Sequence, residues 1–280
     1  MSIMLPSLNS AQLSLADVLP SCLSSLGIRQ QPNALELPPV RSAVVVLIDG
    51  LGALNLSSAS AHARFLSKNS SPETHLSTVF PSTTAAALAS LTTGATPGQH
   101  GMTGYRVLDA ESGEVLNLLT GLGALTSPSS WLRCDPLYAL AAENGITPTV
   151  VAHPRFAETP LTHIIHEGAV QLSAKTIDDR VQAVLSTLNQ PGQHLIVLYI
   201  SELDELAHNK GVSSAEWAAA LESVDGAIKE LSDRIPEGVG LFVTADHGVL
   251  DVTQSQHFLY GLDVDHMRHI AHVGVDHGGH

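Results

Sequence analysis

The sequence predicts an α/β fold with a mostly parallel central sheet and helices on both faces. Three segments are apolar runs, rich in β-branched residues, that end in polar side chains: VVVLIDG (44–50), LIVLYISELD (195–204) and LFVTADHG (241–248). Strands that are hydrophobic throughout are typical of sheets buried on both faces. Helical patterns separate these runs along the chain, and that alternation produces a parallel sheet.

Glycines and capping patterns set the expected boundaries of the helices. Gly27, Gly94 and Gly145 follow three helical segments as C-terminal stops. A Ser-x-x-Glu pattern at 213–216 opens another helix. We expect strands at 43–48, 147–152, 194–200 and 239–245, and helices at 14–26, 84–93, 135–144, 177–189 and 214–233.

Length and composition indicate one domain over residues 1–280. The chain is 44% hydrophobic and 14% charged, which is enough apolar material for a large core. Residues 102–130 are rich in Gly, Ser and Thr, and we expect them to form a small lid or substrate wall.

Charge and cysteine content exclude several classes of protein. The net charge of −14 argues against non-specific binding to nucleic acid or to an acidic membrane. No apolar run reaches the roughly 20 residues of a membrane span. The N-terminal segment lacks the early Lys or Arg of a secretory signal. Cys22 and Cys134 are too few for a disulfide framework, so we expect reduced thiols and a cytoplasmic protein.

Carboxylates and imidazoles follow the predicted strands. Asp49, Asp204 and the pair Asp246–His247 each come at or shortly after a strand end, where parallel sheets bind ligands. Asp204 and His208 have the i, i+4 spacing that puts two side chains on one helix face. Such ligands suit zinc or a similar divalent ion, and the set predicts a two-metal hydrolase. Taken singly, these residues also fit turn formers, caps or a solvent-facing helical pair.

Thr84 is the candidate nucleophile. It opens the helix predicted at 84–93, where the positive end of the helix dipole favours a phosphate. A metal beside its hydroxyl would make the alkoxide accessible near neutral pH. The alternative is that this polar stretch, Ser82 to Thr84, only caps the helix.

His153 and Arg155 follow the strand predicted at 147–152 and are candidates to line a substrate pocket. A structural role for His153 is the alternative. The C-terminal part is rich in histidine, and some of these side chains are candidate ligands.

Four segments together resemble the type I phosphodiesterase and nucleotide pyrophosphatase family of the alkaline phosphatase superfamily. They are VVVLIDGLG (44–52), FPSTTAAALASLTTGATPGQHGMTGY (80–105), ELDELAHNKG (202–211) and TADHGVLDV (244–252). The resemblance implies an alkaline-phosphatase-like fold that binds two zinc ions. Thr84 would be the nucleophile and would share the first ion with Asp49, Asp246 and His247. Asp204 and His208 would hold the second ion together with a later histidine, for which His280 fits best and His277 is the fallback.

Three features depart from the family pattern. Tyr105 stands where nucleotide-cleaving members have an Asn that holds a phosphate oxygen, and we expect Tyr105 to contribute to substrate binding. Ala85–Ala87 replace an aromatic-Pro-Asn segment, which widens the pocket or removes a stacking surface. Family chains usually continue past the last metal-binding His, so we expect a C-terminally shortened domain.

The predicted function is two-metal-dependent hydrolysis of phosphodiester or pyrophosphate bonds in small, nucleotide-like phosphate esters through a phospho-threonine. A phosphomonoesterase or phosphonate hydrolase on the same scaffold is one alternative, with Arg106 or Arg155 as the added cation. A non-catalytic metal- or nucleotide-binding protein is the alternative from another class.

Overall fold

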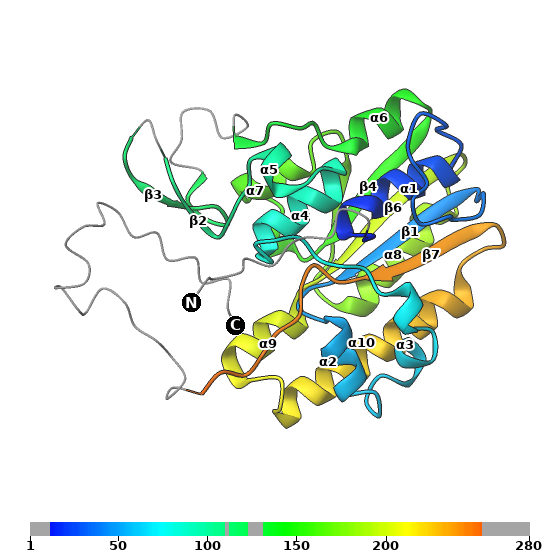
Figure 1. Ribbon diagram of the computed structural model, residues 1–280. Helices are drawn as coiled ribbons and strands as arrows, with labels where there is room; N and C mark the ends of the chain where they lie inside the picture. Colours follow the sequence, from blue (N-terminus) through cyan, green and yellow to red (C-terminus); the bar gives the residue numbers. More distant parts are fainter. Residues whose placement is uncertain (1–11, 110–111, 123–130, 254–280) are drawn as a thin grey trace.

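A five-stranded parallel sheet forms the centre of the molecule (Figure 1). The computed structural model describes residues 12–109, 112–122 and 131–253. The strand order is β5-β4-β6-β1-β7, and every neighbouring pair is parallel. The predicted α/β class is therefore confirmed. The strands are β1 (Ser42–Ile48), β4 (Ile146–Ala152), β5 (Val170–Ser173), β6 (Gln193–Ile200) and β7 (Val239–Thr244).

Helices cover both faces of the sheet, because the central strands are apolar on both sides. In β1, Val45 packs into one core and Val44 into the other, and the strand is buried along its whole length. One core contains α1 (Val18–Ser25), α4 (Thr84–Thr93), α6 (Leu137–Glu143) and α7 (Pro160–Ile165). The other contains α3 (Arg64–Lys68), α8 (Ile177–Leu188), α9 (Glu202–Lys210) and α10 (Ala215–Arg234). None of the helices among the described residues combines the length and apolarity needed to cross a bilayer.

The long periodic segments appear where the sequence predicts them. The four expected strands are β1, β4, β6 and β7, and the five expected helices are α1, α4, α6, α8 and α10. The elements that the sequence did not indicate are short ones, which carry too few residues to show a period. They include β5 and α7, together with α2 (Ala53–Ser58), α3 and α5 (Pro97–His100).

The segment expected to form a lid contains an antiparallel hairpin of β2 (Arg106–Leu108) and β3 (Val115–Asn117). Met102, Leu118 and Leu122 on either side of the hairpin are buried in the α4 core. The described part of this segment is thus anchored to the domain. Its role as a lid or substrate wall stays a prediction.

Register in the sheet brings three strand ends to one place. Ile48 pairs with Ile200 on one side, and Leu47 pairs with Thr244 on the other. The backbone amide of Asp49 extends the β1–β6 ladder by donating to the carbonyl of Ile200 at 2.8 Å. The residues that follow β1, β6 and β7 therefore emerge side by side at the carboxyl edge of the sheet.

The turns after β1 and β7 are in direct backbone contact. A Cβ added to Gly52 would lie 2.6 Å from the Cα of Gly248, which is closer than real Cβ atoms approach backbone. Asn55 of α2 fastens the two turns: its amide group donates to the carbonyl of Val249 at 2.7 Å and its carbonyl accepts from the Val249 amide at 3.1 Å. Any side chain at Gly52 must separate these turns.

Gly52→Ala should therefore lower the free energy of unfolding by about 1–3 kcal/mol, the usual cost of forcing atoms into a filled space. Gly98→Ala is the matched control, because nothing lies within 4 Å of a Cβ at that position. Its effect should stay within about 0.5 kcal/mol. Urea unfolding of both variants checks this, and equal stability of the two would contradict the tight contact.

Candidate active site and metal centre

Asp49 and Asp246 lie at the ends of the adjacent strands β1 and β7 and are buried, with 3% and 0% exposure. One carboxylate oxygen of Asp246 accepts from the backbone amides of Gly50 at 3.1 Å and His247 at 2.9 Å. Its other oxygen, Oδ2, and Oδ1 of Asp49 have no hydrogen-bond partner among the described residues. Each carboxylate thus presents one free acceptor atom inside the protein.

Asp204 and His208 project from the same face of α9, one turn apart, as their spacing predicts. His208 Nε2 lies 3.3 Å from Asp204 Oδ2. Oδ1 of Asp204 is buried and has no hydrogen-bond partner within the described chain. The start of α9 is fixed by a buried ion pair between Arg180 of α8 and Glu202, whose other oxygen accepts from the Ser201 amide at 3.0 Å.

His247 joins the carboxylates to Thr84. Its Nδ1 lies 3.2 Å from the carbonyl of Gly248, so a neutral imidazole that donates there leaves Nε2 unprotonated. Nε2 is 3.1 Å from Thr84 Oγ1 and 3.4 Å from one oxygen each of Asp49 and Asp246. The lone pair of this nitrogen therefore faces the same space as the carboxylates.

Thr84 is the first residue of α4, and Thr83 is its N-cap with extended backbone. Neither hydroxyl caps the helix: Thr83 makes no side-chain cap bond, and Oγ1 of Thr84 is directed to His247. The first-turn amides of α4, which have no acceptor within the helix, and the Thr84 hydroxyl thus lie at the helix end that favours an anion.

Burial, together with the neighbouring negative charges, raises the pKa of the two strand-end carboxyls. Burial raises the pKa of Asp49, and the charges of Asp246 and Asp204 raise it further. Burial likewise raises the pKa of Asp246 to about 6. In the described part of the chain, the basic side chain beside Asp49 and Asp246 is the single imidazole of His247, whose Nε2 lies 3.4 Å from one oxygen of each. The protein therefore holds more carboxylate here than its own cations balance.

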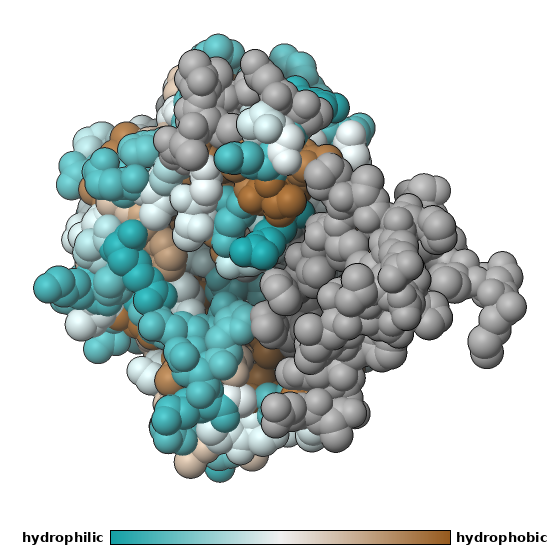
Figure 2. Space-filling view, turned by 90° about the vertical axis from the view of Figure 1, so that its left-hand side faces the viewer, coloured by the Kyte–Doolittle hydropathy of each residue, from teal (hydrophilic) through white to brown (hydrophobic). Residues whose placement is uncertain are grey.

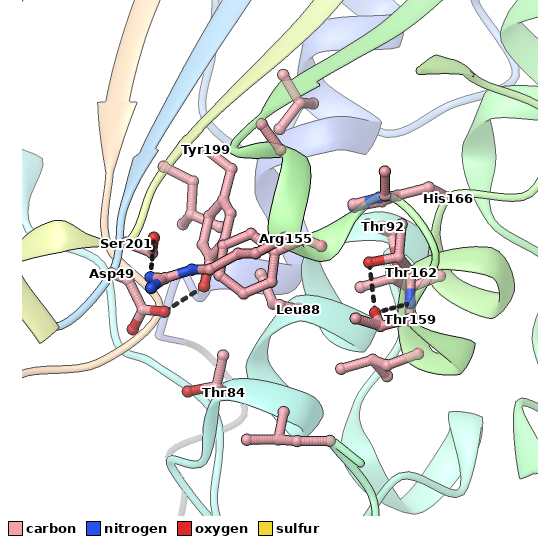
Figure 3. A pocket seen from close by; sticks show the side chains of 18 of the residues that line it. Asp49, Thr84, Leu88, Thr92, Arg155, Thr159, Thr162, His166, Tyr199 and Ser201 are labelled. Atoms are coloured by element: carbon pink, nitrogen blue, oxygen red, sulfur yellow. Dashed lines mark hydrogen bonds between the residues drawn. The ribbon is translucent and has the colours of Figure 1, made fainter. Parts of the chain in front are cut away.

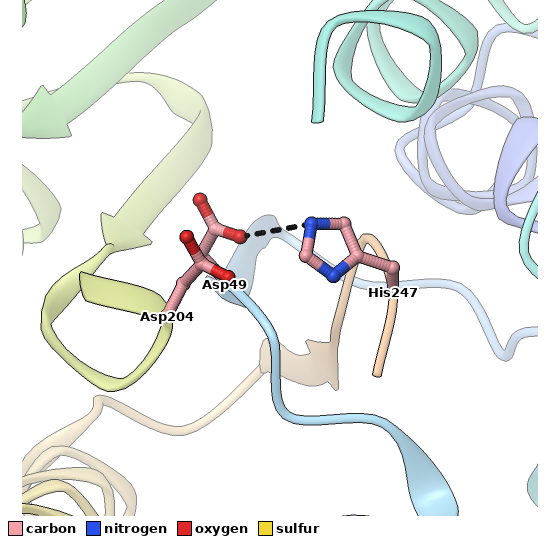
Figure 4. A group of neighbouring side chains, drawn as sticks. All are labelled: Asp49, Asp204 and His247. Atoms are coloured by element: carbon pink, nitrogen blue, oxygen red, sulfur yellow. Dashed lines mark ion pairs between the residues drawn. The ribbon is translucent and has the colours of Figure 1, made fainter. Parts of the chain in front are cut away.

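These residues fit a divalent cation. One ligand atom each from Asp49, Asp204 and His247 lies within 4.8 Å of the others (Figure 4). Each of the three aspartates has one buried oxygen without a hydrogen-bond partner among the described residues, and a cation would coordinate such oxygens. Carboxylate oxygens with an imidazole nitrogen form a donor set that zinc accepts. The geometry supports a metal site, while the identity of the metal remains a prediction.

Tyr199 of β6 orients Asp49, one of the three residues of the cluster. Its hydroxyl donates a hydrogen bond to Oδ2 of Asp49, and its ring packs edge-on against Phe156 at 5.3 Å between centroids. The bond occupies one oxygen of Asp49 and turns the other toward Asp204 and His247. The sequence signal for Tyr199 is a single hydroxyl-bearing side chain in the otherwise aliphatic run 195–200, five residues before Asp204.

A cavity of about 350 Å³ adjoins the cluster, and Asp49, Thr84 and Asp204 form part of its lining. Figure 2 looks onto this end of the molecule, where hydrophilic side chains gather around a hollow. Arg155 lines this cavity, and its role in substrate binding stays a prediction. Its guanidinium bonds Glu205 and donates to Ser201 Oγ at 2.9 Å.

The other candidate residues have different positions. His153 follows β4, and its ring accepts from the Arg155 amide at 3.2 Å. It positions that turn and is absent from the described lining of the cavity. Tyr105 begins the β2–β3 hairpin and is also absent from the described lining, although Leu119 and Thr120 from the same segment are present. His277 and His280 lie outside the described residues, so the third ligand of a second ion stays a prediction.

Comparison with protein families identifies the chain. The family model described as type I phosphodiesterase / nucleotide pyrophosphatase matches residues 43–271. The chain belongs to this family. None of the curated proteins compared with it matches.

Solved structures show the same fold. Murine ectonucleotide pyrophosphatase / phosphodiesterase 5 is 20% identical, with a TM-score of 0.59 over 76% of this chain. The human protein is 17% identical, with a TM-score of 0.56 over 76% of this chain. Phosphonoacetate hydrolase from Sinorhizobium meliloti 1021, in complex with phosphonoformate, is 19% identical, with a TM-score of 0.55 over 75%. This chain spans 59% of the murine and human chains and 57% of the hydrolase.

Metal affinity should depend on pH through Asp246. The folded protein holds the Asp246 proton more tightly than the unfolded chain, because the folded pKa is about 6 against an ordinary 3.8. The metal-free protein therefore loses this contribution to stability as pH rises from 3.8 to about 6. A metal must displace that proton below pH 6, together with the proton that the raised pKa of Asp49 retains, so Zn²⁺ affinity should rise by at least about tenfold per pH unit there.

Titration calorimetry across pH 5 to 8 measures this dependence. Asp246→Asn should flatten the slope below pH 6, and Asp178→Asn on the exposed start of α8 should not. A slope that is the same in all three proteins would contradict the assignment of Asp246 as a ligand.

Tyr199→Phe should weaken Zn²⁺ binding about tenfold, because side chains that orient a ligand are worth that much. The ring contact with Phe156 is kept in this variant, so the free energy of unfolding should change little by comparison. Calorimetry checks the affinity. Wild-type affinity in the variant would mean that the hydroxyl does not hold Asp49 in place.

Proposed function

We propose that the protein hydrolyses phosphodiester or pyrophosphate bonds in small, nucleotide-like substrates with the help of two divalent ions, zinc by preference. The observation that carries this proposal is the position of Thr84. Its hydroxyl lies at the N-terminus of α4, 3.1 Å from His247 Nε2 and beside the cluster of Asp49, Asp204 and His247. A hydroxyl nucleophile, an anion-binding helix end and cation ligands are thus combined in one place.

Asp49, Thr84, Asp246 and His247 would hold one ion. Asp204 and His208, with a C-terminal histidine for which His280 is the candidate, would hold the other. Bound ions would supply positive charge that favours the Thr84 alkoxide and offsets charge on the phosphoryl oxygens.

The residues of the chain then perform two displacements. Thr84 loses its hydroxyl proton to solvent and Oγ1 attacks phosphorus. The bond to the leaving oxygen breaks, and a phospho- or nucleotidyl-threonine forms that keeps any second substituent of the substrate. Water attacks the same phosphorus in the second step, and the bond to Oγ1 breaks to restore Thr84. The first-turn amides of α4 face the phosphoryl oxygens and stabilise the charge that builds on them. Two in-line steps give net retention at phosphorus.

The comparisons support this reading. The family is described by phosphodiesterase and nucleotide pyrophosphatase activity. A second structure of murine ectonucleotide pyrophosphatase / phosphodiesterase 5, 18% identical to this chain, is of an inactive variant with a threonine-to-alanine substitution, in complex with AMP. That variant is consistent with a threonine nucleophile in a nucleotide-binding relative.

A phosphomonoesterase or phosphonate hydrolase is the second candidate. The likeness to phosphonoacetate hydrolase favours it, since that enzyme shares the fold. A terminal phosphate or phosphonate carries more charge than a diester and calls for an added cation. Arg155 lines the cavity, but its guanidinium is bonded to Glu205 and Ser201, so it offers less charge to a substrate than an unpaired side chain would.

Thr84→Ala should abolish turnover while leaving metal binding largely intact, because three other ligands to the first ion remain. Thr83→Ala is the matched control: it is the adjacent threonine, and its hydroxyl has no hydrogen-bond partner among the described residues. That variant should keep turnover within about threefold of wild type. Hydrolysis of a nitrophenyl diester and calorimetry with Zn²⁺ measure the two properties. Near wild-type turnover in Thr84→Ala would exclude Thr84 as the nucleophile.

A further inference from the structure

The cavity beside the cluster extends well beyond the reacting groups. Its lining includes Asp49 and Thr84 at one end and His166 at the other (Figure 3). Tyr138 also lines the cavity and packs beside His166. Helix α4 runs along it, and Thr84, Leu88 and Thr92 all line it. Eight residues of helix correspond to about 12 Å, so the cavity continues about that far from the nucleophile.

The character of the wall changes along this length. Charged lining residues gather at the cluster end: Asp49 and Asp204 belong to the cluster, and Arg155 is bonded to Glu205. Beyond them most of the wall is aliphatic and aromatic, and the hydroxyls of Thr92, Thr159 and Thr162 lie among these side chains. The apolar lining residues are Leu47, Leu88, Leu91, Phe156, Leu161 and Val197. A substituent that extends from the phosphorus into this cavity therefore contacts mostly apolar side chains.

The far end carries two polar atoms without a partner. Tyr138 is fully buried, and its hydroxyl has no hydrogen-bond partner among the described residues; the same holds for Nδ1 of His166. The two rings pack edge-on, with 6.0 Å between centroids. Burial lowers the pKa of His166 to about 4, so its ring is neutral at physiological pH. Buried polar atoms are costly when unpaired, so these two call for an uncharged partner.

We propose that this cavity binds the organic substituent of the substrate, an uncharged aryl group with a hydrogen-bonding atom, such as a hydroxyl, at its far end. The inference rests on the proposed function for the phosphoryl end. A ring matches the apolar middle, and a terminal hydroxyl matches Tyr138 and His166. A nucleoside fits less well, because the wall is mostly apolar and the hydroxyls of Thr159 and Thr162 already bond to each other, so sugar hydroxyls would find few partners.

Binding of stable phosphonates to the zinc-loaded full chain tests this without requiring turnover. Methylphosphonate, phenylphosphonate and 4-hydroxyphenylphosphonate share the phosphoryl end and differ only in the group that enters the cavity. Calorimetry should give about tenfold tighter binding for phenyl than for methyl. The added hydroxyl should strengthen binding about fivefold more.

Two variants locate the group. Tyr138→Phe should remove the fivefold gain from the hydroxyl and leave the methyl and phenyl affinities unchanged. Leu91→Trp should fill the cavity, bring phenyl down to the methyl affinity and leave methyl unchanged. Tyr138→Phe alters one buried, unpaired hydroxyl, so it keeps the test available if Leu91→Trp fails to fold.

Each remaining outcome has a distinct meaning. Equal affinity for methyl and phenyl in a protein that hydrolyses diesters would overturn the cavity assignment alone. The expected order of affinities without hydrolysis of any ester would support it and overturn the proposed function. Tighter binding of thymidine 5′-monophosphate than of 4-hydroxyphenylphosphonate would overturn the aryl assignment and indicate that the cavity binds a nucleoside. An unchanged hydroxyl gain in Tyr138→Phe would overturn the hydrogen bond at the far end.

Discussion

Uncompensated negative charge is the constraint on which this structure depends. Asp49 and Asp246 are buried at adjacent strand ends, and Asp204 faces them from the start of α9. Neighbouring carboxylates repel one another, and burial removes the water that would screen them, which is why the pKa of Asp49 and that of Asp246 are raised. A cation bound between these carboxylates would offset their repulsion, so the arrangement that destabilises the metal-free protein would stabilise a metal complex.

The scaffold holds that charge in place by short and rigid connections. Strand order puts β1 between β6 and β7, so the three chain segments that carry the aspartates are neighbours by topology. Backbone amides of Gly50 and His247 fix Asp246, and the Tyr199 hydroxyl fixes Asp49. Arg180 fixes the junction from which Asp204 projects. Little freedom is left for the carboxylates to move apart.

Much of this was predictable from strand ends and helix spacing, because both are local properties of the chain. The positions of Asp49, Asp204, Asp246 and His247 follow from apolar runs that stop at polar residues, and the position of Thr84 follows from the start of α4. Asn55, Tyr199 and the far end of the cavity were not foreseen. They depend on contacts between distant segments. Examples are the contact of α2 with the turn after β7 and the packing of Tyr138 of α6 against His166 at the end of α7.

The most direct test of the account compares two substrates in one assay: a nitrophenyl nucleotide diester and nitrophenyl phosphate at equal concentration, with zinc and with a chelator. If the protein is a metal-dependent phosphodiesterase, hydrolysis should require zinc and should be faster for the diester than for the monoester. Faster cleavage of the monoester would indicate that the protein is a phosphomonoesterase. Metal binding without cleavage of either ester would contradict the central claim and favour a binding protein.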